Sequence, residues 1–233
     1  MKSKAEVISS FTPEQLLGML NDVEKKHAPA RLYAVGNLQQ IPLPLPRVAI
    51  IGSRKASLEG LKTASDIARV LVKNNVIVVS GLAEGIDTAA HKTTIEEGGD
   101  TIAVLGTPLD RVYPQKNSHL QDIIKRQHLA ISQFPVGQPI QPKNFVLRNR
   151  TMALISNASI IVEAGETSGS LHQGWESLRL GRPLFIYKSI VNDPSLNWPK
   201  KMMEYGAIEL NEAKEVVDVL PSSKRILNME LHV

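Results

Sequence analysis

The chain has no cysteine among its 233 residues, so disulfide bonds, thiolate catalysis and cysteine-ligated zinc are excluded. It also has no apolar run approaching the roughly 18 to 20 residues that a membrane-spanning helix requires. The N-terminal residues lack the apolar core of a signal peptide. We therefore expect a cytoplasmic protein with no membrane partner.

Three signatures of nucleotide-binding proteins and hydrolases are absent as well. The segment from Gly52 to Lys55, after the first predicted core strand, contains neither a G-x-G-x-x-G fingerprint nor a Walker P-loop. Ser170 lacks the G-x-S-x-G context of a hydrolase nucleophile. The formal net charge of +4 and the pI near 9.2 are compatible with a polyanionic partner but do not assign one.

From residue 48 onward, short β-branched apolar runs alternate with helical stretches. This alternation predicts a parallel sheet covered by helices on both faces, and right-handed crossovers make it doubly wound. The fold class is therefore α/β, with an extended Rossmann-like, doubly wound, mainly parallel sheet over residues 47–221. The predicted strands lie near residues 48–51, 76–80, 101–106, 129–133, 159–163 and 184–187.

Residues 1–46 are predicted to form an N-terminal helix and a linker outside the main sheet. Thr12 is placed as the N-cap of this helix, with Gln15 as its capping-box partner. Leu32–Gly36 is predicted as a small edge strand. The alternating prolines of residues 41–46 force an extended chain that leads into the first core strand.

The C-terminal end carries one more predicted helix, over residues 211–220. It starts from an asparagine cap at Asn211 and ends before Pro221. Residues 222–233 are predicted as a C-terminal tail, with a strand at 226–231.

The segment from Ser80 to His91 is predicted to form the central turn of the ligand-binding edge, between a buried strand and a helix. Gly81 and Gly85 lack side chains, so the main chain can turn sharply there and a ligand can approach it closely. The free amides at the start of the following helix favour an anion. One glycine turn often only closes a bend. Small residues follow four of the predicted strands, however, so these turns line one edge of the sheet. We predict that Ser80, Gly81, Ala83 and Gly85 bind a phosphate.

Cationic side chains follow two of these turns. Gly52, Ser53 and Arg54 end the first core strand, and the guanidinium of Arg54 is a fork-shaped donor suited to phosphate. Lys116, next to Asn117, follows the third turn and is predicted to reach the same edge. The alternative, that these cations are ordinary solvated surface charges, stays open from position alone.

The segment from Phe145 to Arg150 places Arg148 and Arg150 on either side of Asn149, shortly after an aromatic residue. This mixture suits single-stranded nucleic acid, where rings stack on bases and cations follow phosphates. The alternative is an ordinary helix start, with the ring in the core and both arginines in water. Convergence with the cations of the earlier turns favours the nucleic-acid interpretation.

A further predicted anion site follows the strand near residues 159–163. Ser168, Gly169 and Ser170 stand at a predicted helix start, where hydroxyls and free amides favour an anion. Glu163, at the end of the strand, can hold an arginine or a ribose hydroxyl.

Asp87 and His91 are four residues apart on the predicted helix, so they share a face and can form an acid–imidazole pair. We favour a structural role over a catalytic dyad. In that interpretation Asp87 braces the turn and His91 is a hydrogen-bonded packing residue. We predict no catalytic residue, no metal site and no cofactor.

The chain carries five blocks in a fixed order and spacing, at residues 52–54, 80–91, 109–114, 145–150 and 162–170. Together these blocks resemble the DNA-processing protein A family (DprA, also called Smf), and the resemblance covers about residues 31–186. It implies an extended Rossmann fold, a basic pocket for single-stranded DNA and a homodimer. It also implies loading of the recombinase RecA onto incoming strands in natural transformation.

The resemblance implies roles for individual residues as well. Arg54 and Lys116 would contact DNA phosphates, and Arg148 and Arg150 would shape the pocket. The two serine and glycine blocks would form its floor.

The chain departs from the family at Pro108, at Gln133 and at residues 187–189. From the length of the sequence we expect neither the N-terminal helical domain nor the C-terminal winged helix of many members. The missing domains weaken the expectation of RecA loading and of a role in transformation more than the expectation of DNA binding.

The leading hypothesis is a non-enzymatic, sequence-tolerant binder of single-stranded DNA in DNA processing and recombination. The competing hypothesis is an enzyme or sensor that binds or hydrolyses a small nucleotide on the same fold. The compact layout and the acids Glu163 and Asp87 near the crevice support it. A third hypothesis is an interaction module whose homodimer matters more than its ligand.

Overall fold

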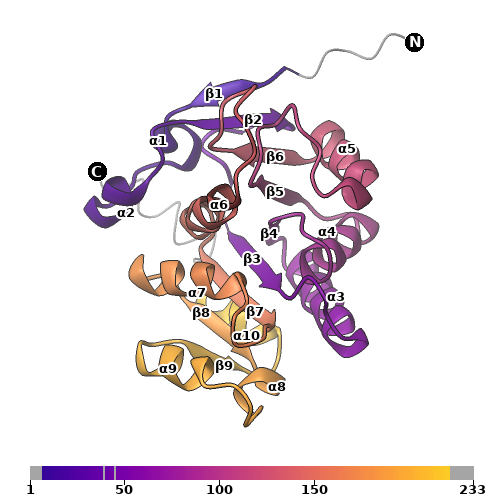
Figure 1. The fold of residues 1–233 in the computed structure, drawn as a ribbon, viewed down its shortest axis with the longest axis vertical. Helices are drawn as coiled ribbons and strands as arrows, with labels where there is room; N and C mark the ends of the chain where they lie inside the picture. The colour runs from indigo at the N-terminus through magenta and orange to yellow at the C-terminus, as the bar shows by residue number, and fades with distance from the viewer. Residues whose placement is uncertain (1–6, 39, 45, 221–233) are drawn as a thin grey trace.

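The computed structural model describes residues 7–38, 40–44 and 46–220. Its strands form one sheet (Figure 1): β1 (Ser9–Phe11), β2 (Leu32–Gly36), β3 (Arg47–Gly52), β4 (Ile77–Ser80), β5 (Thr101–Leu105), β6 (Leu129–Ser132), β7 (Ala158–Glu163), β8 (Leu184–Tyr187) and β9 (Ile208–Leu210). The helices are α1 (Pro13–Leu17), α2 (Asp22–His27), α3 (Leu58–Lys73), α4 (Ile86–Glu96), α5 (Ser118–Gln127), α6 (Pro142–Ile155), α7 (Ser170–Arg179), α8 (Lys188–Val191), α9 (Trp198–Glu204), α10 (Lys214–Val219) and the 3-10 helix η1 (Gln115–Asn117). Within the described ranges, none of the helices combines the length and the apolar character needed to cross a bilayer.

Over the described residues the sheet has nine strands in the order β1-β2-β6-β5-β4-β3-β7-β8-β9. Strands β3 to β9 pair in parallel, whereas β1 and β2 pair antiparallel. The chain adds β4, β5 and β6 on one side of β3 and then returns to add β7 on the other side. The strand order therefore reverses between β3 and β7, the place where open α/β sheets bind ligands. The predicted α/β class and mainly parallel sheet are confirmed, and each predicted core strand lies within one residue of its expected bounds.

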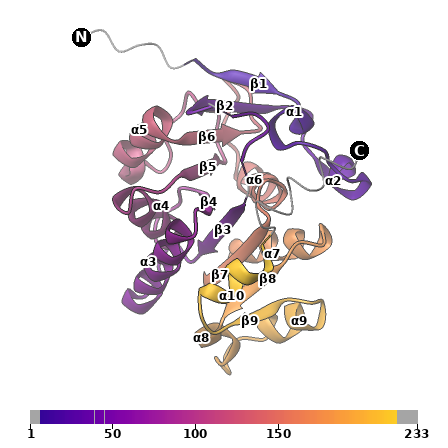
Figure 2. The same cartoon turned by 180° about the vertical axis from the view of Figure 1, so that it is seen from behind.

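Helices cover both faces of the sheet, with α3, α4, α5 and α10 on one side and α1, α6, α7 and α9 on the other (Figure 2). Strand β3 shows how the core is divided. Val48 and Ile50 pack into the cluster that includes α3, whereas Ala49 and Ile51 pack into the cluster that includes Met152 of α6. Successive side chains of a strand point to opposite faces, so one apolar run supplies both halves of the core.

The N-terminal segment contains more than the single helix that was predicted. The Thr12 cap and the Gln15 capping box are present. Helix α1 ends at Leu17, because the next residue, Gly18, has φ of +89° and leaves the helical conformation. A second capping box at Asn21 starts α2. The prediction of β2 as an edge strand was wrong, because β1 pairs antiparallel with it and lies outside it.

The C-terminal part also differs from the prediction. Helix α10 starts three residues later than predicted, with Ala213 in the N-cap position, and the backbone N–H of Asn211 donates to the side chain of Glu215. Helices α8 and α9 and strand β9 were not predicted, and β9 pairs in parallel with β8. The strand predicted at residues 226–231 lies outside the described residues.

Candidate nucleic-acid interface

A cavity of about 540 Å³ opens at the carboxyl ends of β3 and β7, where the strand order reverses. Its walls come from the loop after β3, the start of α4, helix α6 and the turn into α7. This volume is in the range of pockets that enclose a nucleotide-sized ligand. The lining side chains that can bear charge or form hydrogen bonds are Ser53, Arg54, Lys55, Asp87, Arg148, Asn149, Thr167, Ser168, Ser170, His172 and Gln173.

The turn from β4 into α4 is held by groups of the protein itself. Gly85 has φ of +78°, and a Cβ there would lie 2.2 Å from the carbonyl oxygen of Ser53, so the position requires glycine. Asp87 accepts hydrogen bonds from the N–H groups of Gly81 (3.1 Å) and Ala83 (3.3 Å). These amides were predicted to hold a phosphate. Because the Asp87 carboxylate occupies them, the turn shapes the wall and does not offer those donors to a ligand.

Arg148 lies in the inner wall of the cavity and is only 6% exposed. Its guanidinium donates to the carbonyl oxygens of Gly81 and Val104 and to the Asn149 side chain. Burial lowers the pKa of Arg148, and the Asp87 carboxylate opposes that shift. Burial in turn raises the pKa of Asp87, against the Arg148 charge and the amide hydrogen bonds. This carboxylate and this guanidinium therefore compensate each other in the floor of the cavity.

Arg54, Phe145 and Tyr113 form a stacked group. The guanidinium carbon of Arg54 lies 5.8 Å from the centre of the Phe145 ring, and the Tyr113 ring lies 5.1 Å from it on a tilted plane. Arg54 and Phe145 line both the main cavity and a smaller one of about 50 Å³ beside the loop after β5. A ring flanked by an exposed guanidinium can stack on an unpaired base.

The turn between β7 and α7 forms another wall. The hydroxyl oxygens of Ser168 and Ser170 lie 2.7 Å apart in a hydrogen bond. Asn149 fixes this turn by donating its side-chain amide to the carbonyl oxygen of Gly169 (2.9 Å). Helix α7 begins at Ser170, so hydroxyls and a helix start lie on the same cavity as the cations, an arrangement suited to phosphate.

Two residues predicted to bind the ligand are buried and serve the fold instead. The hydroxyl of Ser80 donates to the carbonyl oxygen of Ile50 (2.7 Å). The side-chain amide of Asn117 donates to the carbonyl oxygen of Leu82 (2.9 Å) and to Thr88 (2.8 Å). Both side chains brace the turn after β4, and neither lines the cavity.

Two predicted cations lie outside the cavity lining. Lys116 is 78% exposed and pairs with Glu84, with 2.9 Å between Nζ and Oε2. Arg150 pairs with Glu176 of α7, with 3.0 Å between Nε and Oε1. Side chains two residues apart on an α-helix point about 200° apart. Because Arg148 points into the cavity, Arg150 points away from it. The four predicted cations therefore do not all line one cavity, and a DNA contact by Lys116 stays a prediction.

The residues considered for acid–base chemistry make separate contacts. His91 is buried with Nδ1 2.7 Å from the hydroxyl of Thr101, and burial is the main cause that lowers its pKa to about 3. Asp87 is committed to the turn described above. Glu163 accepts hydrogen bonds from the N–H and the hydroxyl of Ser57 and so fastens the start of α3. In the part of the chain that the structure describes, no group of three or more His, Asp or Glu side chains could hold a metal ion.

Four polar residues of the cavity were not assigned to the site from the sequence: Lys55, Thr167, His172 and Gln173. Lys55 could have been included because it directly follows Arg54. Gln173 stands three residues after Ser170, which places both on one face of α7. Thr167 gives no comparable signal, because only the turn before α7 brings it to the cavity.

The sequence was compared with known protein families and with individual proteins. A family model described as DNA recombination-mediator protein A matches residues 10–221. The chain belongs to this family. The DNA processing protein DprA of Streptococcus pneumoniae is 37% identical to it over 190 residues, which cover 82% of this chain and 66% of that protein. DprA of Bacillus subtilis is 30% identical over 193 residues, 65% of its length, so the chain spans just under two thirds of these relatives.

Solved structures of the DNA recombination-mediator protein A family agree with the fold. The X-ray structure of DprA from Streptococcus pneumoniae aligns with a TM-score of 0.78 and 33% identity, over 92% of this chain and 75% of that one. The Helicobacter pylori protein aligns with a TM-score of 0.75 and 25% identity, over 92% and 95%. That second structure concerns the single-stranded DNA binding mode of the Helicobacter protein.

Proposed function

We propose that the cavity between β3 and β7 binds single-stranded DNA with little preference for base sequence. The observation that carries the proposal is the charge of its lining. Arg54, Lys55 and Arg148 contribute three cations, and Asp87 is the one carboxylate among the described residues that line it. Phosphate contacts carry no base information, and stacking accepts every base, so such a site tolerates sequence.

The lining residues have different parts in this proposal. Arg54 is exposed and sits over the Phe145 ring, so it can contact a phosphate while a base stacks on the ring. Arg148 is fixed by backbone carbonyls and balances the charge of Asp87, so the positive surplus of the lining comes from Arg54 and Lys55. Ser168 and Ser170 offer hydroxyls to a phosphate from the wall at α7.

The proposal is one of binding without catalysis. Asp87 is committed to backbone amides and His91 is buried away from the cavity, which supports it. It extends, as in the family name, to mediating recombination: presenting single strands to a recombinase such as RecA, as a homodimer, in DNA processing or natural transformation. Sedimentation of the protein alone and in mixture with RecA tests the homodimer and the recombinase contact.

A fluorescence anisotropy titration with labelled oligo-dT tests the binding proposal. Unlabelled duplex DNA and nucleoside monophosphates serve as competitors, and each titration is run at two salt concentrations. We expect salt-sensitive binding that only single strands compete away. Displacement by a mononucleotide would instead favour a small-nucleotide site, which the cavity volume also accommodates.

The matched variants are Arg54→Ala and Lys73→Ala. Lys73 ends α3, about 22 Å along the helix axis from its first residue near the cavity, and it is exposed. We expect Arg54→Ala to weaken binding for all sequences and to reduce the salt slope by about 0.7 for each lost phosphate contact. Lys73→Ala should behave as the unaltered protein. Equal binding by both variants would remove Arg54 from the site.

A further inference from the structure

Four side chains from three helices gather at the C-terminal half of α7. Arg179 lies on α7, Arg150 on α6, and Lys26 and His27 end α2. We call these four residues the α2–α7 basic cluster. Glu176 joins two of them, with its Oε1 3.0 Å from Nε of Arg150 and its Oε2 2.7 Å from Nε of Arg179. The cluster thus contains Arg150, which the cavity does not use.

The charges of the cluster do not cancel. The cluster holds three permanent cations, and two of them, Arg150 and Arg179, share the carboxylate of Glu176, so a surplus of about two positive charges remains. Desolvation first, and then the charges of Arg179 and Lys26, lower the pKa of His27. Arg150 lowers it further and Glu176 raises it. Among the charges that act on this exposed imidazole, three lower its pKa and the carboxylate of Glu176 opposes them.

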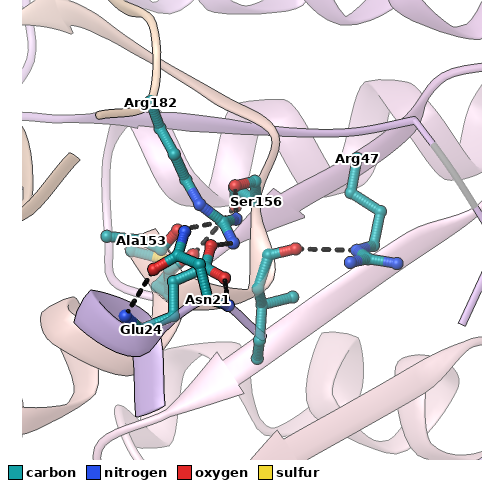
Figure 3. Close-up of polar contacts among 8 residues, drawn as sticks. Asn21, Glu24, Arg47, Ala153, Ser156 and Arg182 are labelled. Atoms are coloured by element: carbon teal, nitrogen blue, oxygen red, sulfur yellow. Dashed lines mark hydrogen bonds and ion pairs between the residues drawn. The ribbon is translucent and has the colours of Figure 1, made fainter. Parts of the chain in front are cut away.

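Helix α2 is held in place beside α7 by an ion pair. The guanidinium of Arg182, just after α7, lies between the Glu24 carboxylate and the carbonyl oxygens of Ala153 and Ser156 (Figure 3). The two charged side chains are only 15% and 11% exposed. The backbone N–H of Asn21 also donates to Glu24 (2.9 Å). The cations that end α2 are therefore carried on a fixed support.

The cluster is continuous with the cavity along two helices. On α7, His172 lines the cavity, and Glu176 and Arg179 follow at four and seven residues, which places all three on one face. The path from His172 to Arg179 is about 10 Å along the helix. On α6, Asn149 lines the cavity and Arg150 directly follows it.

We propose that the α2–α7 basic cluster is a second contact for the same single strand, which leaves the cavity along α7 and reaches the end of α2. This inference rests on the proposed function of the cavity and adds the direction of the bound strand and a minimum length for full affinity. Arg150 and Arg179 are 53% and 33% exposed, so a phosphate can exchange with Glu176 for their guanidinium groups.

A length series of oligo-dT tests the second contact. A short oligonucleotide of about four to six nucleotides fills the cavity, and one of about 16 nucleotides also reaches the cluster. Two variants remove cluster charge: Arg179→Gln, and the double variant Lys26→Gln/His27→Gln, which leaves both Glu176 ion pairs intact. Lys73→Gln on α3 is the control. Circular dichroism confirms that each variant is folded.

We expect both cluster variants to lower the affinity for the long oligonucleotide about threefold or more. The salt slope of that binding should fall by about 0.7 for each lost phosphate contact. The affinity for the short oligonucleotide should not change. The control should change neither. Equal losses for both lengths, or no loss for the long one, would overturn the second contact. If the unaltered protein bound neither length, the proposed function of the cavity would itself fail.

Discussion

The ion pair between Glu24 and Arg182 makes a quantitative prediction about how α2 is held. The test is a double-mutant cycle with Glu24→Gln, Arg182→Met and the combined variant. Arg182→Met leaves a largely buried carboxylate without its partner and removes the donor to the carbonyl oxygens of Ala153 and Ser156. Glu24→Gln keeps the shape of the side chain but offers one acceptor oxygen where Glu24 offers two, so it removes the charge and one of the hydrogen bonds from Arg182 and from the N–H of Asn21.

The magnitudes follow from this geometry. Breaking one partner of a buried pair costs about 3 to 5 kcal/mol. Both side chains keep some exposure, so we expect the loss of unfolding free energy for Arg182→Met to lie near the lower end of this range, at about 3 kcal/mol. Burial, together with the charge of Arg182, lowers the pKa of Arg47 to about 9. Arg182→Met removes this repulsion between the two guanidinium groups, which offsets part of the loss. We expect about 1.5 kcal/mol for Glu24→Gln. The combined variant should lose only about 3 kcal/mol, because no carboxylate is then left unpaired.

Urea unfolding followed by circular dichroism measures these free energies, with an unchanged m-value as the test that the unfolding transition is comparable. The expected coupling energy is about 1.5 kcal/mol, and Arg182→Met should lower Tm by about 6 to 12 °C. The exposed pair Asp122 and Arg126 on α5 is the control cycle and should couple by no more than about 0.5 kcal/mol. If the losses of the two single variants sum to that of the combined variant within about 0.5 kcal/mol, the two side chains are not coupled and the prediction is refuted.

Two further predictions concern the turn after β4 and the buried imidazole of α4. Gly81→Ala would place a Cβ 2.0 Å from Nη1 of Arg148, so we expect a loss of about 1 to 3 kcal/mol of stability and weaker oligo-dT binding, with unchanged anisotropy as the contrary result. Burial lowers the pKa of His91 to about 3, so between about pH 3 and 6.5 the unfolded chain binds the extra proton and stability falls as pH falls. At pH 5.5 this residue should cost about 1.4 kcal/mol relative to pH 7.5, and a folded His91→Asn variant should lack that part of the pH dependence in urea titrations. An equal loss in the variant and the unaltered protein would contradict the assignment.

The core strands were predictable because each is a continuous run of aliphatic and β-branched residues, such as Val48 to Ile51 in β3. Strands β1 and β9 have three residues each and depend on pairing with β2 and β8, so they carry no comparable local signal. The capping box at Thr12 was predictable for the opposite reason, because its partners are three residues apart. The asparagine cap predicted at Asn211 was wrong, because α10 begins at Lys214 and Ala213 holds the N-cap position.

The site residues were predictable in kind more than in position. Arg148 and Arg150 have the same local sequence signal, but the phase of α6 sends one into the cavity and the other to Glu176. Lys116 follows a strand as expected, yet it lies outside the cavity lining and pairs there with Glu84. A choice between such alternatives depends on neighbours that are distant in sequence.

The α/β class and the edge of the sheet at which the cavity opens could be predicted from the sequence, because apolar periodicity and small residues after strands are local properties. Which residues meet at that edge depends on the tertiary packing. Arg54 and Ser168 line one cavity because β3 and β7 are neighbours where the strand order reverses. The same packing turned Asp87 onto the amides of the predicted phosphate turn, since a buried carboxylate requires hydrogen-bond donors and those amides were the ones within reach.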